Sequence, residues 1–177
     1  VRTVAGAGPY GSNGDGGPAT QATIGQVWDV VVAPDGAVYF ADDSGQARIR
    51  RIGTDGIITT VAGGGGLPPT DGMVPTELST PDIWSLALGS DGRLYFAFFS
   101  WNHTQIGVVD VAGRYFTVAR GPIGHMALGF DGTIYYTSPN NVYRVSAIAP
   151  DGTLRTVAGS GVRCLGPYEG THECGNN

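Results

Sequence analysis

Three side chains suited to acid–base or nucleophilic chemistry, Asp29, Ser85 and His125, occupy the same position in three repeated segments of the chain. A grouped Asp, Ser and His would suggest a catalytic triad, and His with a carboxylate also suggests a metal site. Equivalent positions of successive repeats lie on separate structural units, however, and need not touch. We therefore predict no catalytic residue, no metal site and no cofactor.

Aromatic side chains are the better candidates for binding. Trp28 and Trp84 occupy equivalent positions in two repeats, and Trp101 lies beside Asn102 and His103 in a polar loop. An exposed tryptophan can stack on a sugar ring or anchor a protein partner. Packing between repeats is the alternative role for Trp28 and Trp84. The triplet that begins at Asn102 also fits a glycosylation acceptor.

Residues 11–22 match part of a calcium-binding loop. Asn13 and Asp15 are in register with ligand positions of such a loop. The first and twelfth positions, where acidic ligands are required, are Gly11 and Ala22. We therefore expect a structural turn in which Asp15 caps local amides.

Both cysteines, Cys164 and Cys174, lie in the last, turn-rich stretch of the chain. A disulfide that closes the loop 165–173 would imply an oxidising compartment, and so an extracellular or cell-surface protein. A metal site would need further ligands, and only His172 lies between the cysteines. Two free thiols are the other alternative.

Composition narrows the fold and the partners. Of the 177 residues, 41% are hydrophobic, 14% are charged and 30 are glycine, which is typical of strands joined by tight turns. The net charge of −5 argues against nucleic acid as a partner. The basic cluster Arg48, Arg50 and Arg51 lies on one expected strand and so divides between its two faces. The chain contains no apolar run long enough to insert into a membrane.

Two phrases recur in a fixed order and define the repeats. The phrase Thr-Val-Ala begins at Thr3, Thr60, Thr117 and Thr156, at intervals of 57, 57 and 39 residues. Asp-Gly followed by a short apolar segment begins at Asp35, Asp91 and Asp131. Repeats of about 40–50 residues are typical of propeller blades. The expected strands are residues 27–33, 37–41, 48–52 and 57–62, then 84–89, 93–98, 105–111 and 115–119, then 124–130, 133–138, 141–147 and 154–158.

The turns orient each repeat. Asp-Gly supplies the positive φ of a tight hairpin, and structural turns are expected at Asp35, Asp55, Asp91, Asp131 and Asp151. In an antiparallel meander alternate turns emerge at opposite ends, so these turns should share one face. The long connections 8–25 and 64–81 and the short connection 121–123 should lie on the other face, where binding loops are expected.

Several segments of the first repeat resemble the NHL repeat: NGDGGPAT (residues 13–20), PDGAVYFAD (34–42), RIRRI (48–52) and DGIITTVAG (55–63). They are most similar to the type found in large secreted bacterial proteins, including teneurin-like and Rhs (YD-repeat) proteins. In the later repeats the Asp42 position becomes Phe98 and Ser138, and we assign the Arg48 position to Gln105 and Asn141.

The resemblance implies an all-β fold of three four-stranded antiparallel propeller blades, which is too few to close a ring. It places Asp29, Ser85 and His125 on the channel. The whole of residues 1–177 would be one propeller segment. Its expected parts are an outer strand of a preceding blade (1–6), blades at 26–63, 82–120 and 123–159, and a disulfide-closed connection to a further blade (160–177).

NHL propellers serve mostly as binding platforms, which implies a non-enzymatic scaffold or a surface that recognises protein or carbohydrate. The first alternative is part of a propeller-type lyase or hydrolase whose site is completed by other blades. The second is a structural subunit of an extracellular appendage or filament. In each case the remaining blades of the same protein, or a neighbouring chain, would complete the ring.

Overall fold

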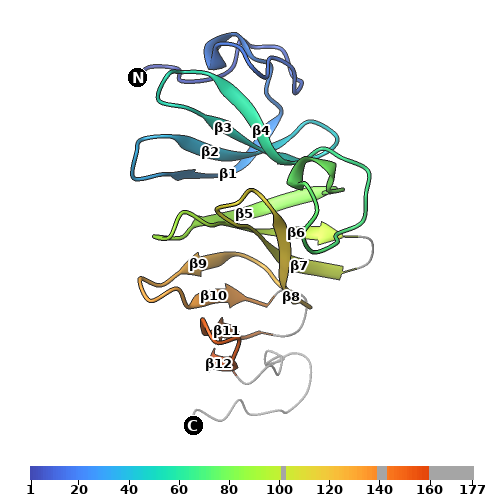
Figure 1. The fold of residues 1–177 in the computed structure, drawn as a ribbon, viewed down its shortest axis with the longest axis vertical. Helices are drawn as coiled ribbons and strands as arrows, with labels where there is room; N and C mark the ends of the chain where they lie inside the picture. Colours follow the sequence, from blue (N-terminus) through green and yellow to red (C-terminus); the bar gives the residue numbers. More distant parts are fainter. Residues whose placement is uncertain (101–102, 139–142, 160–177) are drawn as a thin grey trace, which may run out of the picture.

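Twelve strands form three four-stranded antiparallel sheets in the computed structural model, which describes residues 1–100, 103–138 and 143–159. Figure 1 shows the sheets stacked along the long axis of the molecule. The first comprises β1 (Gln26–Val32), β2 (Val38–Asp43), β3 (Arg48–Ile52) and β4 (Ile58–Gly63); the second β5 (Asp82–Leu88), β6 (Leu94–Ser100), β7 (His103–Val109) and β8 (Tyr115–Arg120); the third β9 (Met126–Leu128), β10 (Ile134–Thr137), β11 (Val145–Ile148) and β12 (Leu154–Ala158). The predicted partial β-propeller of three blades is therefore confirmed.

Asp-Gly turns set the register of the sheets. Oδ1 of Asp35 accepts the backbone N–H of Ala37 at 2.9 Å, and Gly36 adopts the positive φ of 90° that the hairpin needs. The same carboxylate-to-backbone bond occurs at Asp55, Asp91, Asp110, Asp131 and Asp151. The backbone N–H groups of Thr133 and Thr153 lower the pKa values of Asp131 and Asp151. These turns therefore have the structural role that the sequence indicates.

Two hydrophobic cores hold the blades together. Leu86, Phe96 and Phe98 of the second blade pack against buried residues of the first, such as Ile49. Between the second and third blades, Ile106 is one of the buried residues of a separate cluster. Each sheet is thus covered by a neighbour, which explains why the strands carry apolar residues on both faces.

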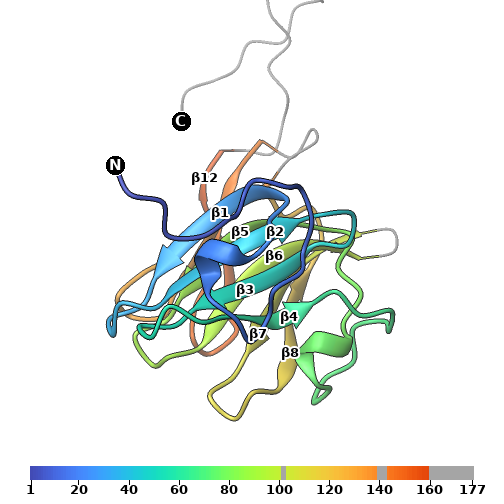
Figure 2. The same ribbon diagram turned by 90° about the horizontal axis from the view of Figure 1, so that it is seen from above.

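The long connections are built into the blades that follow them. Residues 8–25 contain the 3-10 helix η1 (Ala19–Gln21) and cross the open face of the first sheet (Figure 2). Residues 64–81 contain η2 (Pro75–Glu77), which contacts β4. We call these stretches the first and second connecting segments.

Each connecting segment binds the outer strand of its own blade through an aspartate. Asp15 accepts the backbone N–H of Thr60 at 2.8 Å, and Asp71 accepts that of Thr117 at 2.7 Å. The expectation that Asp15 caps local amides is therefore wrong, because its backbone donor lies 45 residues further along the chain. The two aspartates are equivalent, although the sequence around Asp71 shows little of the motif around Asp15.

Residues 1–6 form no strand, because the described residues provide no preceding blade for them to pair with. Their assignment to such a blade stays a prediction. Our assignment of Asn141 to the Arg48 position is wrong: Ser138 donates its N–H to the carbonyl of Arg144, which occupies that position, and Asn141 lies outside the described residues.

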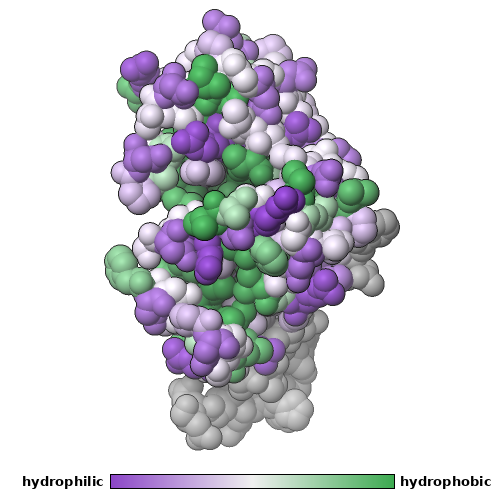
Figure 3. Space-filling view, viewed as in Figure 1, coloured by the Kyte–Doolittle hydropathy of each residue, from purple (hydrophilic) through white to green (hydrophobic). Residues whose placement is uncertain are grey.

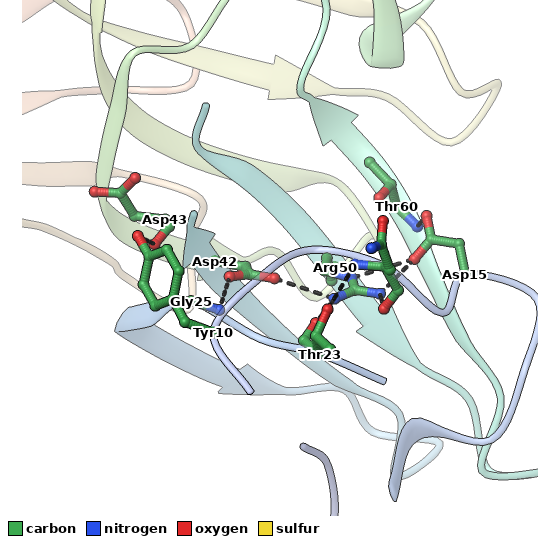
Figure 4. A network of polar contacts seen from close by, with 9 residues as sticks. Tyr10, Asp15, Thr23, Gly25, Asp42, Asp43, Arg50 and Thr60 are labelled. Atoms are coloured by element: carbon green, nitrogen blue, oxygen red, sulfur yellow. Dashed lines mark hydrogen bonds and ion pairs between the residues drawn. The ribbon is translucent and has the colours of Figure 1, made fainter. Parts of the chain in front are cut away.

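A buried arginine joins the first connecting segment to its blade (Figure 4). Arg50 is fully buried and makes ion pairs with Asp15 at 2.7 Å and with Asp42 at 3.1 Å. Its guanidinium also donates to the carbonyls of Thr23 and Asn13, so all of its N–H groups have acceptors. Burial of this charge is tolerated because each donor is satisfied.

The second blade fills the equivalent space with aromatic rings. Gly107 occupies the position of Arg50, opposite Phe96, and the ring of Tyr115 fills the space above it. The Tyr115 ring lies 6.1 Å from Phe96 and 6.3 Å from Phe98, which replaces Asp42. The two blades therefore fill the equivalent space differently, with a buried ion cluster in the first and aromatic rings in the second.

The backbone donor that Asp42 binds in the first blade is also absent from the second. Gly25 donates its N–H to Asp42 in the first blade at 2.7 Å. The equivalent residue of the second blade is Pro81, which has no N–H, and Phe98, paired with Ile83, takes the position of Asp42. The exchange of Asp42 for Phe98 therefore leaves no orphan donor at this position.

Acid should weaken the anchor at Asp15. Burial alone would raise the pKa of Asp15, but hydrogen bonds from Thr60 and Arg50 outweigh it and the pKa is lowered. A lowered pKa means that the ionised carboxylate stabilises the fold above the unfolded-state value of about 4, and that this contribution is lost as the pH falls through the folded-state value.

We therefore expect the stability difference between the native protein and Asp15→Asn to be full at pH 6–7 and to shrink below about pH 4. Urea unfolding followed by tryptophan fluorescence across pH 3–7 measures it. A difference that stays constant over this range would contradict the assignment.

Candidate ligand pocket at the ends of the inner strands

All three blades contribute to one pocket where the innermost strands begin. Its volume is about 540 Å³. Trp28 comes from β1, while Asp82 and Trp84 come from β5. His125 lies just before β9, and the wall is completed by Ile83, Phe99, Thr104, Ile123 and Gly124. The pocket lies at the end of the blades opposite the Asp-Gly turns, as expected for a binding site.

The two tryptophans differ in how they are held. Trp84 is half-buried and donates its indole N–H to the carbonyl of Gly124 in the third blade at 3.0 Å. Trp28 is 52% exposed, and its indole N–H reaches a carboxylate oxygen of Asp43 at 3.4 Å. Trp84 therefore packs between blades and forms a fixed wall, while Trp28 presents a free ring face.

The polar groups of the pocket come from different blades. Asp82 and His125 are both exposed and line the pocket. The hydroxyl of Thr104 accepts the N–H of Ile123 at 2.7 Å and donates to the carbonyl of Gly121. Thr104 thereby ties the short third connection to β7, and this connection carries His125 to the pocket.

Asp29 and Ser85 do not line this pocket but join neighbouring blades. Asp29 accepts the backbone N–H of Leu86 in the second blade at 2.7 Å. Ser85 accepts that of Met126 in the third blade at 3.1 Å. Their shared position therefore serves as an inter-blade hydrogen-bond acceptor, and no triad forms.

Of the other binding candidates, only His103 lies within the described residues. His103 begins β7, paired with Ser100, and is not among the lining residues. Trp101, Asn102 and the two cysteines, with their predicted glycosylation site and disulfide, lie outside the described residues. Among residues 1–100, 103–138 and 143–159, no three His, Cys, Asp or Glu side chains lie close enough to hold a metal ion, and no helix there could cross a membrane.

Sequence reasoning missed part of the pocket. Asp82, Phe99, Thr104 and Ile123 were not among the candidates. Asp82 could have been found, because it begins the strand that carries Trp84 and side chains two residues apart point to the same face. Ile123 could not, because its place depends on how the short third connection folds back.

No known protein-family model matches the chain, and no curated protein matches it in sequence. Solved structures do share its fold. Virginiamycin B lyase from Staphylococcus aureus is 20% identical, with a TM-score of 0.54 over 80% of this chain and 45% of the lyase. A gluconolactonase from Xanthomonas campestris is 16% identical, with a TM-score of 0.53 over 77% of this chain and 48% of the enzyme.

An aldose sugar dehydrogenase from Streptomyces coelicolor, solved with PQQ bound, is 20% identical, with a TM-score of 0.53 over 86% of this chain and 48% of that enzyme. The chain thus spans a little under half the length of these β-propeller proteins. At this identity the similarity shows the fold alone.

These comparisons correct our prediction of a non-enzymatic scaffold or recognition surface. The similar propellers are a lyase, a lactonase and a sugar dehydrogenase, and they favour the enzymatic alternative.

Proposed function

We propose that the chain forms part of a propeller enzyme of the lyase or hydrolase class, whose site is completed by further blades. One observation carries the proposal: the three blades bring Trp28, Trp84, Asp82 and His125 to a single pocket. Aromatic walls with a few convergent polar groups are typical of small-molecule sites.

The proposed substrate is a sugar or sugar lactone. Indole rings present flat apolar faces that stack on the C–H face of a sugar ring. Among the similar structures, one is a gluconolactonase and another acts on aldose sugars. In this site Trp28 and Trp84 would orient the ring, and Asp82 and His125 would bind its oxygen atoms. Imidazole is the side chain most often used for proton transfer, so His125 is the proposed acid–base group.

We also propose that the blades are NHL-like repeats. The equivalent docking of Asp15 and Asp71 on the outer strands supports this, because it extends the motif of the first repeat to the second.

The test uses the natural polypeptide that contains this chain, assayed for ring opening of sugar lactones by proton release. His125→Ala should lower kcat/KM about 100-fold, the lower end of the range for loss of an acid–base group. Trp84→Ala should mainly raise KM. Phe130→Ala removes a fully exposed aromatic side chain on the opposite face, and it should leave both constants unchanged.

Saturable binding of gluconolactone, lost on Trp84→Ala and followed by tryptophan fluorescence, would support the site even where turnover is slow. Turnover that is unaffected by both His125→Ala and Trp84→Ala would overturn the proposal.

A further inference from the structure

Outside the shared core, the space between the outer strands of the second and third blades is open, whereas the equivalent space between the first and second is filled. A groove of about 1170 Å³ lies between them and reaches Val32 and Pro34 of the first blade. Phe116 and Val118 lie on one wall, and Tyr136, Ile148 and Leu154 on the other. Figure 3 shows apolar surface in the hollow between these sheets. This volume exceeds the roughly 300–1,000 Å³ of ordinary small-molecule pockets.

The chain itself shows what fills such a space. Blades of a propeller are arranged radially, so the space between neighbouring blades is widest at their outer strands. Between the first two blades the second connecting segment fills it, with Leu78 fully buried and Met73 packed on the same core. Its Gly72 donates to the carbonyl of Tyr115 at 2.7 Å, and the N–H of Tyr115 donates back to Met73 at 3.1 Å.

The first connecting segment makes the same contacts on β4. Gly16 donates to the carbonyl of Ile58 at 2.8 Å, and the N–H of Ile58 donates to Gly17 at 3.0 Å. Together with the bonds from Asp15 to Thr60 and from Asp71 to Thr117, this defines one repeated docking mode. An Asp-Gly segment adds to the edge of the outer strand, and its carboxylate takes the threonine N–H.

The third blade keeps the receiving strand but lacks the segment. Leu154 lies opposite Ile148 as Tyr115 lies opposite Val109, and Thr156 takes the place of Thr117. Ile58 and Tyr115 are fully buried, but Leu154 is 61% exposed. Only residues 121–125 connect the second blade to the third, and no described residue covers this edge.

We infer that this groove is a binding site for an extended peptide segment of another chain, one that carries an Asp-Gly turn followed by an apolar residue. The Asp carboxylate accepts the N–H of Thr156, the turn pairs with the backbone of Leu154, and the apolar residue packs between Phe116 and Leu154. The two built-in segments supply the precedent for each of these contacts.

The probe is a synthetic peptide that copies residues 68–79, titrated into ¹⁵N-labelled protein. We expect the amide signals of Leu154 and Thr156 to shift, with the Thr156 proton moving downfield. Replacement of the aspartate by alanine in the peptide should weaken binding about tenfold or more, because a charge-assisted hydrogen bond is lost.

Leu154→Lys in the protein should weaken binding by a similar factor. It is an exposed position, so the fold tolerates the change. Val157→Lys is the matched control: Val157 is also exposed on β12 but does not line the groove, and binding should be unchanged.

Shifts confined to Thr60 and Thr117 would mean that the peptide displaces the built-in segments, and would overturn the inference. Binding that Leu154→Lys leaves intact would also overturn it. A dimer of the protein that Leu154→Lys dissociates would assign the groove to a second copy instead of a peptide.

Discussion

Arg50→Met is expected to destabilise the protein by about 3–5 kcal/mol, the usual cost of removing one partner from a buried ion pair. The change leaves the carboxylate of Asp42, which is fully buried, with only the N–H of Gly25. The carbonyl of Thr23 also loses its Arg50 donor, and that of Asn13 keeps only the N–H of Thr23. Asp15 suffers less, because its side chain is 39% exposed. Chemical denaturation followed by tryptophan fluorescence measures the loss.

Arg51→Met is the matched control for this experiment. Arg51 is the next residue of β3 and faces the other way, with a 3.8 Å ion pair to exposed Asp35 and a guanidinium 5.9 Å from the ring centre of Tyr39. Such surface contacts contribute about 0–1 kcal/mol. Equal losses for the two arginine variants would contradict the role given to Arg50.

Transferring three residues of the second blade into the first tests whether the first connecting segment needs the ion pairs of Arg50 or only a filled space. Asp42→Phe with Arg50→Gly and Ile58→Tyr reproduces the aromatic set of Phe98, Gly107 and Tyr115. The triple variant removes the stranded carboxylate and refills the space, so we expect it to be more stable than Arg50→Met alone. A triple variant that is less stable would show that the connecting segment needs the ion pairs.

Tyr115→Ala is expected to cost about 3–5 kcal/mol, because it empties a fully packed site. The ring is completely buried against Phe96 and Phe98. Gly107 lies directly beneath the ring, where an added Cβ would come within 2.5 Å of it. Because glycine has no side chain, nothing on this residue could refill the space. Thermal and urea unfolding measure the effect.

Tyr115→Phe provides the comparison. It keeps the ring and removes only the hydroxyl, which lies 3.2 Å from Oγ1 of Thr117. The loss should be about 0.5–1.5 kcal/mol, the value of one hydrogen bond. If the phenylalanine variant were as unstable as the alanine variant, the hydroxyl and not the ring would hold the second connecting segment.

The strands could be predicted closely because their signals are local. Asp-Gly turns fix where each hairpin begins, and predicted strands such as 48–52 and 154–158 match β3 and β12. The third blade was predicted less well: residues 141–147 were expected as a strand, and β11 is Val145–Ile148. In that repeat the residue equivalent to Arg48 is Arg144, three residues after Asn141, so the predicted strand began too early.

The pocket and the ion cluster could be predicted only in part. Trp28, Trp84 and His125 stand out as unusual side chains at equivalent ends of inner strands, and the structure brings them together. Asp15 and Arg50 belong to separate motifs, and their pairing depends on the path of residues 8–25 over the sheet. The non-enzymatic prediction relied on the usual role of NHL propellers, and the lyase, lactonase and dehydrogenase with this fold correct it.

The docking of each connecting segment has a consequence for the order of events during synthesis. A ribosome makes Asp15 45 residues before Thr60, and Asp71 46 residues before Thr117. The aspartate at the start of each of these blades therefore has no backbone partner until the last strand of that blade has emerged. The first two blades close only when complete, by joining their two ends. Among its described residues the third blade has no such bond between an aspartate and its outer strand, so its sheet is built from neighbouring hairpins alone.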